Sequence, residues 1–520
     1  MSKAFFITTP VYYVNASPHV GHSYTQIICD CISRYKRLRG REVFFLTGTD
    51  EHGQKVQRSA EEAGKETQSF IDDVVVKFKD LWKRLGISYD DFVRTTQSRH
   101  IETVQSALNI LYEKGDIYEG IYAGFYCTPC ETFWQKTQLE GGVSCPDCKR
   151  PTEYIEEKSY FFKLSKYQSW LLGYINSHPD FIKPDFRKNE ILGFLAQPLN
   201  DLCISRPQKR LSWGIEIPFS REHVVYVWVD ALLNYISAPG FTSDKQKFKQ
   251  IWPADIHVMA KDIIRFHAVY WPILLHAMGF GEQELPKCVF AHGWWVTSGE
   301  KMSKSKGNIV DPNVYIEKYG ADSLRYFLLR EITLGLDGNF SESSFIDRYN
   351  GDLANDLGNL LNRTLTMVHK YFNGKIVSPL VLSDKDNTLM EKRSQTIEAF
   401  KAYMDELNIN KALLEIWALI NAANKHIEDS APWKIAKEGN TEKLSGFLLT
   451  LLRTIETVAV LIFPFMPHTS KQMAAQLNIK QGAEDKDIYS ISKIILDDKG
   501  FIINPGHTVF APVPLFPRIK

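Results

Sequence analysis

The sequence predicts an α/β protein in which a parallel sheet is interrupted by a cysteine-bearing insert and followed by an all-helical region. An apolar run at 5–14, a helical period up to residue 38 and a second apolar run at 43–46 predict strand, helix and strand. That order is the first unit of a Rossmann-type nucleotide-binding sheet. Two cysteine pairs interrupt the pattern after residue 125, and helical periodicity dominates from residue 349 to about 475.

The tetrapeptide His-Val-Gly-His at 19–22 lies between the first strand and its helix. In such a sheet the carboxyl end of a strand and the amino end of a helix border the ligand crevice, where backbone N–H groups and the helix dipole attract anions. We expect Gly21 to let a nucleotide approach the backbone. We also expect His19 and His22 to donate hydrogen bonds to phosphate oxygens.

A second motif, Lys-Met-Ser-Lys-Ser at 301–305, brings a cluster of positive charge. Glycines at 299 and 307 flank it and can act as hinges. Its lysines repel one another unless an anion lies between them, and the phosphates of ATP would supply that anion. The sequence contains no Gly-x-x-x-x-Gly-Lys-Ser/Thr motif, so it does not predict a P-loop nucleotidase.

Together the two motifs resemble the signatures of class I aminoacyl-tRNA synthetases, His-Ile-Gly-His and Lys-Met-Ser-Lys-Ser. Val20 replaces the isoleucine of the first, and the second is identical. The resemblance implies ATP binding by a set of residues from both motifs and the strand before the second: Gly21, Gly293, Lys301, Met302, Ser303 and Lys304. It also implies catalysis by positioning and charge stabilisation, without a covalent nucleophile, through His19, His22, Lys301 and Lys304.

Four of the eight cysteines form two Cys-x-x-Cys pairs separated by fourteen residues: Cys127, Cys130, Cys145 and Cys148. This spacing is close to that of four-cysteine zinc sites. Four protein ligands leave no open coordination position, so we expect one structural Zn²⁺. Disulfides are the alternative, which a reducing compartment disfavours. A zinc ribbon that binds nucleic acid would show the same cysteine pattern.

The insert at about 116–223 resembles the zinc-bearing connective peptide of methionyl-tRNA synthetases, and it is too short for the editing domain of the isoleucyl, valyl and leucyl relatives. The block Val224–Ala238 resembles the Trp-x-Asp-Ala block of the methionyl enzymes. The resemblance implies a methionine pocket made of nine residues: Val11, Tyr13, Asp50, Trp228, Ala231, Leu232, Tyr235, Ile263 and His267.

Within that set, the resemblance implies that Asp50 holds the α-ammonium group of the amino acid. A helix N-cap is the alternative role for this aspartate. The other members are mostly apolar or aromatic, which suits an unbranched thioether. They also offer a hydroxyl and an imidazole to the weakly accepting sulfur atom.

The helical region carries a third set of candidates. Asn359 and Arg363 are four residues apart, so they share a helix face, and Pro432-Trp433 follows later. This region resembles the anticodon-binding bundle of methionyl-tRNA synthetases. The resemblance implies that Asn359 and Arg363 bind base edges of the CAU anticodon and that Trp433 stacks on a base. A buried aromatic after a proline turn is the alternative for Trp433.

The predicted organisation has five parts. They are the first half of the catalytic domain (1–115), the connective insert (116–223), the second half with the lysine motif (224–307), a stem-contact linker (308–348), and the anticodon-binding helices with a tail (349–520). We expect the main sheet to resume in the segment 224–238, with a buried strand in its front half and the start of a helix in its back half, and to end with a strand at 289–296.

The chain has 520 residues and a formal net charge of +1, so a nucleic-acid partner must be argued from local patches. No signal peptide is evident, and Arg453 and Glu456 break the most apolar late segment, 447–466. We expect a cytoplasmic monomer without a membrane partner.

The resemblance implies a methionine–tRNA ligase. It would form methionyl-adenylate and pyrophosphate from methionine and ATP with Mg²⁺, and then transfer methionine to the 3′ end of tRNA(Met), initiator included. Two alternatives remain. A cysteinyl enzyme is disfavoured because its zinc should bind the substrate thiol through an open position. A non-catalytic tRNA-binding paralogue is disfavoured because both signatures are intact.

Overall fold

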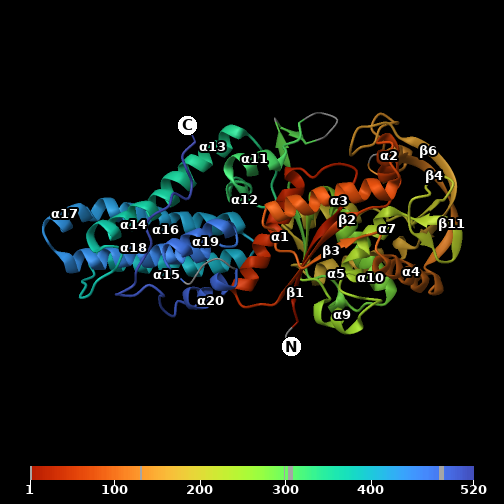
Figure 1. Cartoon of the computed structure of the whole chain (residues 1–520). Helices are drawn as coiled ribbons and strands as arrows, with labels where there is room; N and C mark the ends of the chain where they lie inside the picture. Colours follow the sequence, from red (N-terminus) through yellow and green to blue (C-terminus); the bar gives the residue numbers. More distant parts are fainter. Residues whose placement is uncertain are drawn as a thin grey trace. The chain divides into compact units, whose positions relative to one another are not determined.

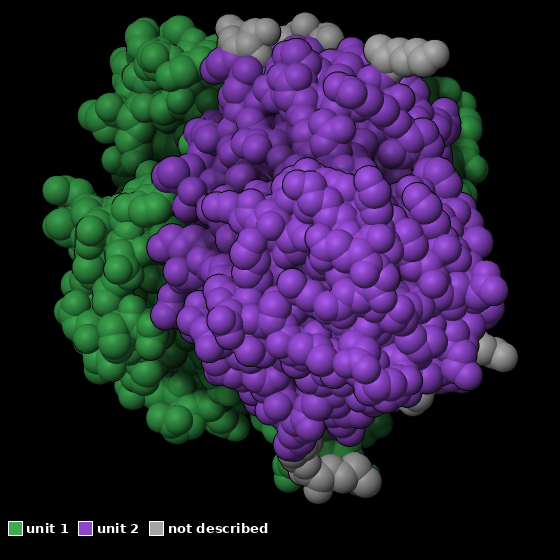
Figure 2. All heavy atoms as spheres, turned by 90° about the vertical axis from the view of Figure 1, so that its left-hand side faces the viewer, with its two compact units in different colours: residues 1–18, 43–81, 89–292 green, residues 19–42, 82–88, 293–520 purple. Residues whose placement is uncertain are grey.

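The computed structural model describes residues 3–128, 130, 132–297, 299–302, 308–479 and 485–519. The chain forms two compact units, which Figure 2 colours separately. Unit 1 comprises residues 1–18, 43–81 and 89–292, and unit 2 comprises residues 19–42, 82–88 and 293–520. The helix that follows the first strand therefore belongs to unit 2. The five-part organisation predicted from the sequence is a different division and stays a prediction.

Unit 1 is built on a six-stranded sheet with the order β3-β2-β1-β12-β13-β7, in which every neighbouring pair is parallel. This confirms the predicted Rossmann-type sheet. Its strands are β1 (Phe5–Tyr13), β2 (Val43–Asp50), β3 (Asp91–Arg94), β7 (Ile182–Lys183), β12 (Ile256–Ala260) and β13 (Val289–His292).

The end of β1 is shifted relative to β2 by a bulge. Thr8 pairs with Leu46 and Val11 pairs with Gly48, so β1 has one more residue than β2 between these two pairs. Pro10 lies in the bulge, where its missing N–H removes no ladder hydrogen bond. Because a one-residue offset moves side chains to the other face of a sheet, the bulge sets the direction in which the following residues point.

Two smaller antiparallel sheets belong to the insert of unit 1, and Figure 1 shows the long strands β4 and β6 side by side. The first sheet contains β5 (Thr132–Trp134), β4 (Ile117–Cys127), β6 (Glu153–Phe162) and β8 (Leu202–Cys203), and the second contains β10 (Glu216–Ile217), β11 (Ser220–Val225) and β9 (Ser205–Pro207). The helices of unit 1 are α2 (Gln54–Glu62), α4 (Ser98–Glu113), α5 (Gln168–Ser177), α6 (Asp185–Leu195), α7 (Val227–Leu232), α8 (Asn234–Ser237), α9 (Lys245–Ile251) and α10 (Trp271–Met278). Helix α3 (Thr67–Arg84) begins in unit 1 and ends in unit 2.

Two strand predictions were wrong in detail. The strand expected in the front half of 224–238 is β11, which ends at Val225 and belongs to the small insert sheet, while the expected helix begins already at Val227 as α7. The main sheet resumes instead at β12. The strand expected at 289–296 is two strands, because β13 ends at His292 and β14 (Trp295–Thr297) pairs elsewhere. An apolar run shows burial, and it does not show which sheet buries it.

Unit 2 is mainly helical. A three-stranded sheet contains β14, β15 (Glu300–Lys301) and β16 (Gly338–Asn339). The helices are α1 (Val20–Leu38), α11 (Pro312–Tyr319), α12 (Ala321–Arg330), α13 (Glu342–Arg348), α14 (Asn359–Phe372), α15 (Asp384–Asp405), α16 (Ile409–Ser430), α17 (Pro432–Lys437), α18 (Thr441–Leu461), α19 (Pro467–Gln476) and α20 (Asp485–Leu496). A π-helical segment, Tyr349–Gly358, leads into α14.

Helices α15, α16 and α18 pack against one another, which confirms the predicted helical bundle (Figure 1). Helix α18 is long and apolar enough to cross a membrane by length and composition alone. However, 94% of its most apolar window is buried inside the protein, as expected of the core helix of a bundle.

Candidate active site

The carboxyl ends of β1 and β2 bring two predicted methionine-pocket residues together. Tyr13 pairs in register with Asp50, and Val11 pairs with Gly48. Asp50 is only 4% exposed. Because carboxyl ends of parallel strands border the ligand crevice, a buried carboxylate here is placed to hold a cation such as an ammonium group. The helix that follows Asp50 has Gly53 at its N-cap, so the alternative N-cap role for Asp50 is wrong.

A second group of pocket residues lies around the π-helical turn Phe266–Tyr270. The Tyr235 hydroxyl lies 2.8 Å from Nε2 of His267, and Nδ1 of His267 lies 2.9 Å from the Ile263 carbonyl oxygen. A carbonyl can only accept, so Nδ1 of His267 donates to it. In the neutral ring Nε2 then accepts from the Tyr235 hydroxyl. Burial lowers the pKa of His267 to about 4, which keeps the ring neutral at physiological pH.

The remaining predicted pocket residues lie on α7 or pack on the same core. The Trp228 ring stacks on Phe266 with centroids 3.6 Å apart and planes 8° apart. Leu232 is part of the hydrophobic core on which Val11, Tyr13, Trp228 and Ile263 pack, and Ala231 beside it is buried. These residues therefore share one hydrophobic core within unit 1, and their role as a methionine pocket stays a prediction.

In unit 2 the two motif histidines form the amino end of α1. Nδ1 of His19 accepts from the Gly21 N–H at 3.0 Å, and Nδ1 of His22 accepts from the His19 N–H at 3.1 Å. The centroids of the two imidazole rings lie 3.9 Å apart. Because both Nδ1 atoms accept, each neutral ring carries its proton on Nε2 and can donate a hydrogen bond from that atom. A Cβ at Gly21 would lie 2.8 Å from Cε1 of His19, so any larger residue at this position would displace the His19 ring.

The region around the second motif is described in part. A Cβ at Gly293 would lie 2.1 Å from the Leu336 carbonyl oxygen, so only glycine fits this close approach of two backbones. The backbone of Lys301 is paired in β15, and Met302 is buried. Ser303 and Lys304 lie outside the described residues.

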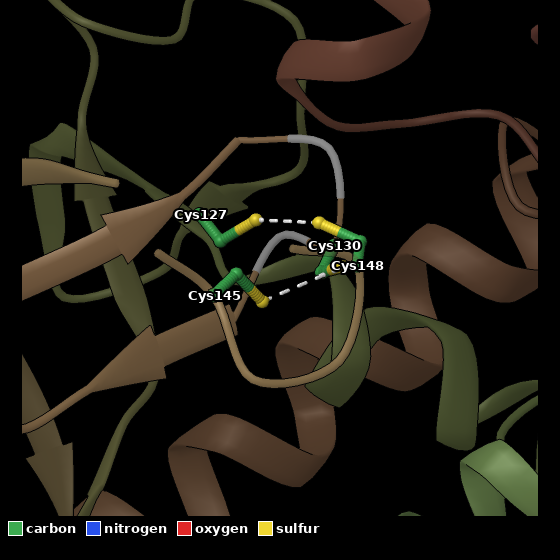
Figure 3. Close-up of side chains that lie close together, drawn as sticks. All are labelled: Cys127, Cys130, Cys145 and Cys148. Atoms are coloured by element: carbon green, nitrogen blue, oxygen red, sulfur yellow. Dashed lines mark hydrogen bonds between the residues drawn. The ribbon is translucent and has the colours of Figure 1, made fainter. Parts of the chain in front are cut away.

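The four cysteines of the two Cys-x-x-Cys pairs converge, and Figure 3 shows their sulfur atoms turned toward one another. All four Sγ atoms lie within 4.8 Å of one another. Cys127 and Cys148 are 3.5 Å apart, and Cys130 and Cys145 are 3.9 Å apart. A disulfide needs about 2.05 Å. A tetrahedral ion with Zn–S bonds of about 2.3 Å needs sulfur atoms about 3.8 Å apart, which these distances match.

Without a metal ion the thiols of the cluster differ in their tendency to lose a proton. Hydrogen bonding with Cys130 lowers the pKa of Cys127 to about 6, whereas burial raises the pKa of Cys145 to about 11. Four thiolates in one partly buried cluster repel one another, and a dication removes that repulsion. The cluster is therefore chemically suited to one closed, structural metal site.

The three anticodon candidates lie at the ends of helices in unit 2. Asn359 is the first residue of α14 and is exposed, and Arg363 lies one turn later, 2.7 Å from Oε1 of Glu428. Trp433 follows Pro432 at the start of α17 and is 47% exposed. The alternative of a buried tryptophan is therefore wrong. An exposed indole is free of the cost of unpacking when a base stacks on it.

Unit 2 also contains a basic cavity of about 640 Å³ beside the amino end of α12. Five basic side chains line it, Arg34, Lys83, Arg84, Lys318 and Lys471, with Asp322 as the acidic member. Asp322 accepts the Thr469 N–H at 2.6 Å and so serves the amino end of α19. Four of these basic side chains also form ion pairs, Arg34 with Asp30 and Asp485, Arg84 with Glu317, Lys318 with Glu342 and Lys471 with Asp485. These pairs offset much of the positive charge that the lining residues bring to the cavity.

Sequence reasoning gave no role to several residues around the pocket. Asp230 lies between two buried histidines, His52 and His100. Phe266 forms the stacking partner of Trp228. Closeness in sequence could have pointed to two of them, because His52 follows Asp50 by two residues and Asp230 follows Trp228 by two. What the sequence could not show is that the two segments meet.

Comparisons with known proteins find similarity over nearly the whole chain. Residues 5–155 and 149–365 match the family of tRNA synthetases class I (M), and residues 380–520 match the anticodon binding domain of methionyl tRNA ligase. A methionine–tRNA ligase of Caldanaerobacter subterraneus is 48% identical over 100% of this chain and 79% of its own length. The Thermotoga maritima enzyme is 47% identical over 99% of this chain and 80% of its own length.

A solved structure shows the same fold. Methionyl-tRNA synthetase of Mycobacterium tuberculosis in complex with methionyl-adenylate superposes with a TM-score of 0.93 at 39% identity, covering 99% of this chain and all of that one. The apo form of that protein superposes with a TM-score of 0.86. Fold, signature residues and matches over both units thus agree, and this chain belongs to the methionyl-tRNA synthetase family of class I.

Proposed function

We propose that this chain ligates methionine to tRNA(Met) with the residues described above. In the first step a carboxylate oxygen of methionine attacks the α-phosphorus of ATP, a new O–P bond forms, and pyrophosphate leaves. In the second step a hydroxyl of the terminal ribose of tRNA attacks the activated carbonyl carbon and AMP leaves. Neither step needs a covalent nucleophile from the protein, so the work of the residues is positioning and charge stabilisation.

The observation that carries this proposal is the protonation pattern at the amino end of α1. Backbone N–H groups occupy Nδ1 of both His19 and His22, which directs both protons to Nε2. Two imidazole donors at a helix amino end suit the phosphate oxygens, on which negative charge grows as pyrophosphate departs. We assign Gly21 and Gly293 to ATP binding with Met302 and Ser303, and we assign Lys301 and Lys304 to charge stabilisation.

Methionine would be held in unit 1. The Asp50 carboxylate would bind the α-ammonium group, because it is buried beside Tyr13 at the crevice edge. Trp228 and the residues Val11, Ala231, Leu232 and Ile263 would surround the side chain. The Tyr235 hydroxyl and the neutral His267 ring would face the sulfur atom, which accepts hydrogen bonds only weakly.

Two metal ions belong to the proposal in different roles. One Zn²⁺ would be held by Cys127, Cys130, Cys145 and Cys148 as a structural ion of the insert. Mg²⁺ would enter with ATP as part of the substrate, where it neutralises phosphate charge.

For tRNA, we assign anticodon binding to Asn359, Arg363 and Trp433, supported by the exposure of Asn359 and Trp433. The basic cavity lined by Lys83 and Lys318 would contact backbone phosphates. We further propose that the protein works as a cytoplasmic monomer on initiator and elongator tRNA(Met). The buried position of α18 supports a protein without a membrane partner.

The experiment that tests this proposal is charging of transcribed tRNAs with radiolabelled methionine. The expected result is charging of tRNA(Met), with a large loss when its CAU anticodon is replaced and no change in methionine activation. Equal charging with any anticodon would contradict the roles given to Asn359, Arg363 and Trp433. Formation of methionyl-adenylate without transfer to any tRNA would contradict the second step.

A further inference from the structure

Asp230 connects two segments that carry the predicted methionine pocket. It lies in the first turn of α7, two residues after Trp228 and directly before Ala231, and it is fully buried. One carboxylate oxygen lies 2.7 Å from Nδ1 of His52, and the other lies 2.6 Å from Nε2 of His100. A buried carboxylate needs hydrogen-bond partners, and here a ring nitrogen lies at each of its two oxygens.

The first connection leads from Asp230 to the end of β2. His52 follows Asp50 by two residues, so its position fixes the loop that presents the Asp50 carboxylate. The same loop is held on its other side by Trp213, whose Nε1 donates to the Glu51 carbonyl oxygen at 2.6 Å. Gly53 closes the loop with a φ of 103°, which glycine adopts without strain.

Glu51 itself makes the loop rigid. Its carboxylate accepts from the Thr49 hydroxyl at 2.7 Å, from Nε of Arg94 at 2.6 Å and from the Thr96 hydroxyl at 2.5 Å. These three hydrogen bonds hold the backbone on each side of Glu51. The contact of His52 with Asp230 then sets the position of this loop relative to α7.

The second connection leads from Asp230 to α8. Nδ1 of His100 lies 2.9 Å from the Ser237 hydroxyl, two residues after Tyr235. Asp230 and Trp228 lie on the same helix, α7. Through His100, Asp230 is also connected to α8, which carries Tyr235. Burial acts to raise the pKa of Asp230, but His52 and His100 together lower it to about 2, so the acceptor stays ionised.

We propose that Asp230 is a positioning residue, which holds the Asp50 side and the Trp228–Tyr235 side of the methionine pocket at a fixed separation. It does so through its hydrogen-bond partners His52 and His100. This inference rests on the proposed methionine site. It assigns Asp230 no contact with substrate. Loosening the link should weaken methionine binding and leave ATP binding unchanged, because the link connects segments assigned to methionine and includes none of the residues assigned to ATP. Losses of about 10- to 100-fold are expected for misplacement of this kind.

The test compares KM for methionine with KM for ATP in ATP–pyrophosphate exchange. The variants are Asp230→Asn, His52→Ala and His52→Asn, of which the last keeps an amide nitrogen at the place of Nδ1. The matched control is Asp116→Asn. Asp116 is also a buried carboxylate of unit 1 with two donors, Lys166 and Tyr167, each at 2.6 Å, and it lies in the insert.

The expected result is a methionine KM raised about 10- to 100-fold in Asp230→Asn and His52→Ala, with ATP KM unchanged and with recovery in His52→Asn. Unchanged methionine KM in both impaired variants would overturn the inference, as would an equal rise in Asp116→Asn. If Asp230→Asn does not fold, the two His52 variants decide the question. Absence of methionine-dependent exchange in the unmodified protein would instead contradict the proposed function.

Discussion

The Tyr235 hydroxyl donates to Nε2 of His267 across 2.8 Å, so the ring that we propose to face the methionine sulfur is already hydrogen-bonded within the protein. The ring is neutral and its second nitrogen already donates to the Ile263 carbonyl. A neutral imidazole places no positive charge beside the proposed thioether site, which suits an uncharged sulfur atom and offers no ion pair to an anionic side chain.

The buried His267 ring should make stability depend on pH. Its pKa is about 4 in the folded protein and about 6.5 in an unfolded chain, so the unfolded chain takes up the proton first as pH falls. Stability should therefore be lost as pH decreases from about 6.5 toward 4, by about 2 kcal/mol at pH 5. In His267→Gln, which keeps an acceptor for Tyr235, this loss should be smaller. Urea unfolding of both proteins at pH 7.5 and pH 5 measures the difference, and identical pH dependence would contradict it.

The two nitrogens of His22 can be separated by substitution. Asparagine places an amide oxygen where Nδ1 lies, so His22→Asn should keep the cap on the His19 N–H and lose only the Nε2 donor. We expect the rate of adenylate formation to fall about 10²- to 10³-fold with little change in melting temperature. Single-turnover kinetics measures this rate. His22→Ala, which also removes the cap, is the comparison, and a wild-type rate in His22→Asn would exclude the donor role.

Removal of one cysteine ligand should remove the metal. Cys145→Ser leaves three thiolates for an ion that needs four, so the purified variant should contain far less zinc than the one ion per chain expected of the unmodified protein. Elemental analysis and a lowered melting temperature would report this loss. Cys288→Ser is the matched control, because Cys288 is buried and lies outside the four-cysteine cluster. Full zinc content in Cys145→Ser would show that the four cysteines are not its ligands.

The exposed Trp433 indole should matter for tRNA and not for activation. Trp433→Ala should weaken tRNA(Met) binding by about 1–3 kcal/mol, the worth of one stacked base. Trp433→Phe keeps an aromatic face and should lose less. Filter binding measures the affinity, and ATP–pyrophosphate exchange should be equal in all three proteins. Unchanged tRNA affinity in the alanine variant would place anticodon binding elsewhere.

Much of the fold could be predicted because local periodicity decided it. The strand, helix and strand at the start of the chain appear as β1, α1 and β2, close to the expected bounds. The short strand β3 was missed because four residues are too few to show a period. Strand β7 was missed for a topological reason, because a two-residue strand from the insert joins the main sheet beside β13.

For the site residues, too, local sequence patterns could be interpreted and long-range contacts could not. Residues inside a motif, such as His19 and Cys127, could be identified because their neighbours in sequence are also their neighbours in space. The contacts of Asp230 with His52 and His100 span 178 and 130 residues, and a single sequence contains no signal for such pairings. The β1 bulge at Pro10 likewise depends on the register against β2, which only the assembled sheet shows.

ATP–pyrophosphate exchange with each amino acid supplied separately tests the central claim most directly. It reports formation of the adenylate without tRNA, and so it examines the pocket and the signature residues together. The account predicts exchange with methionine and with no other standard amino acid. Exchange with cysteine or another amino acid in place of methionine would contradict the pocket assigned to Asp50, Tyr235 and His267. No exchange with any amino acid, in folded protein that contains its metal, would contradict the proposed enzymatic activity itself.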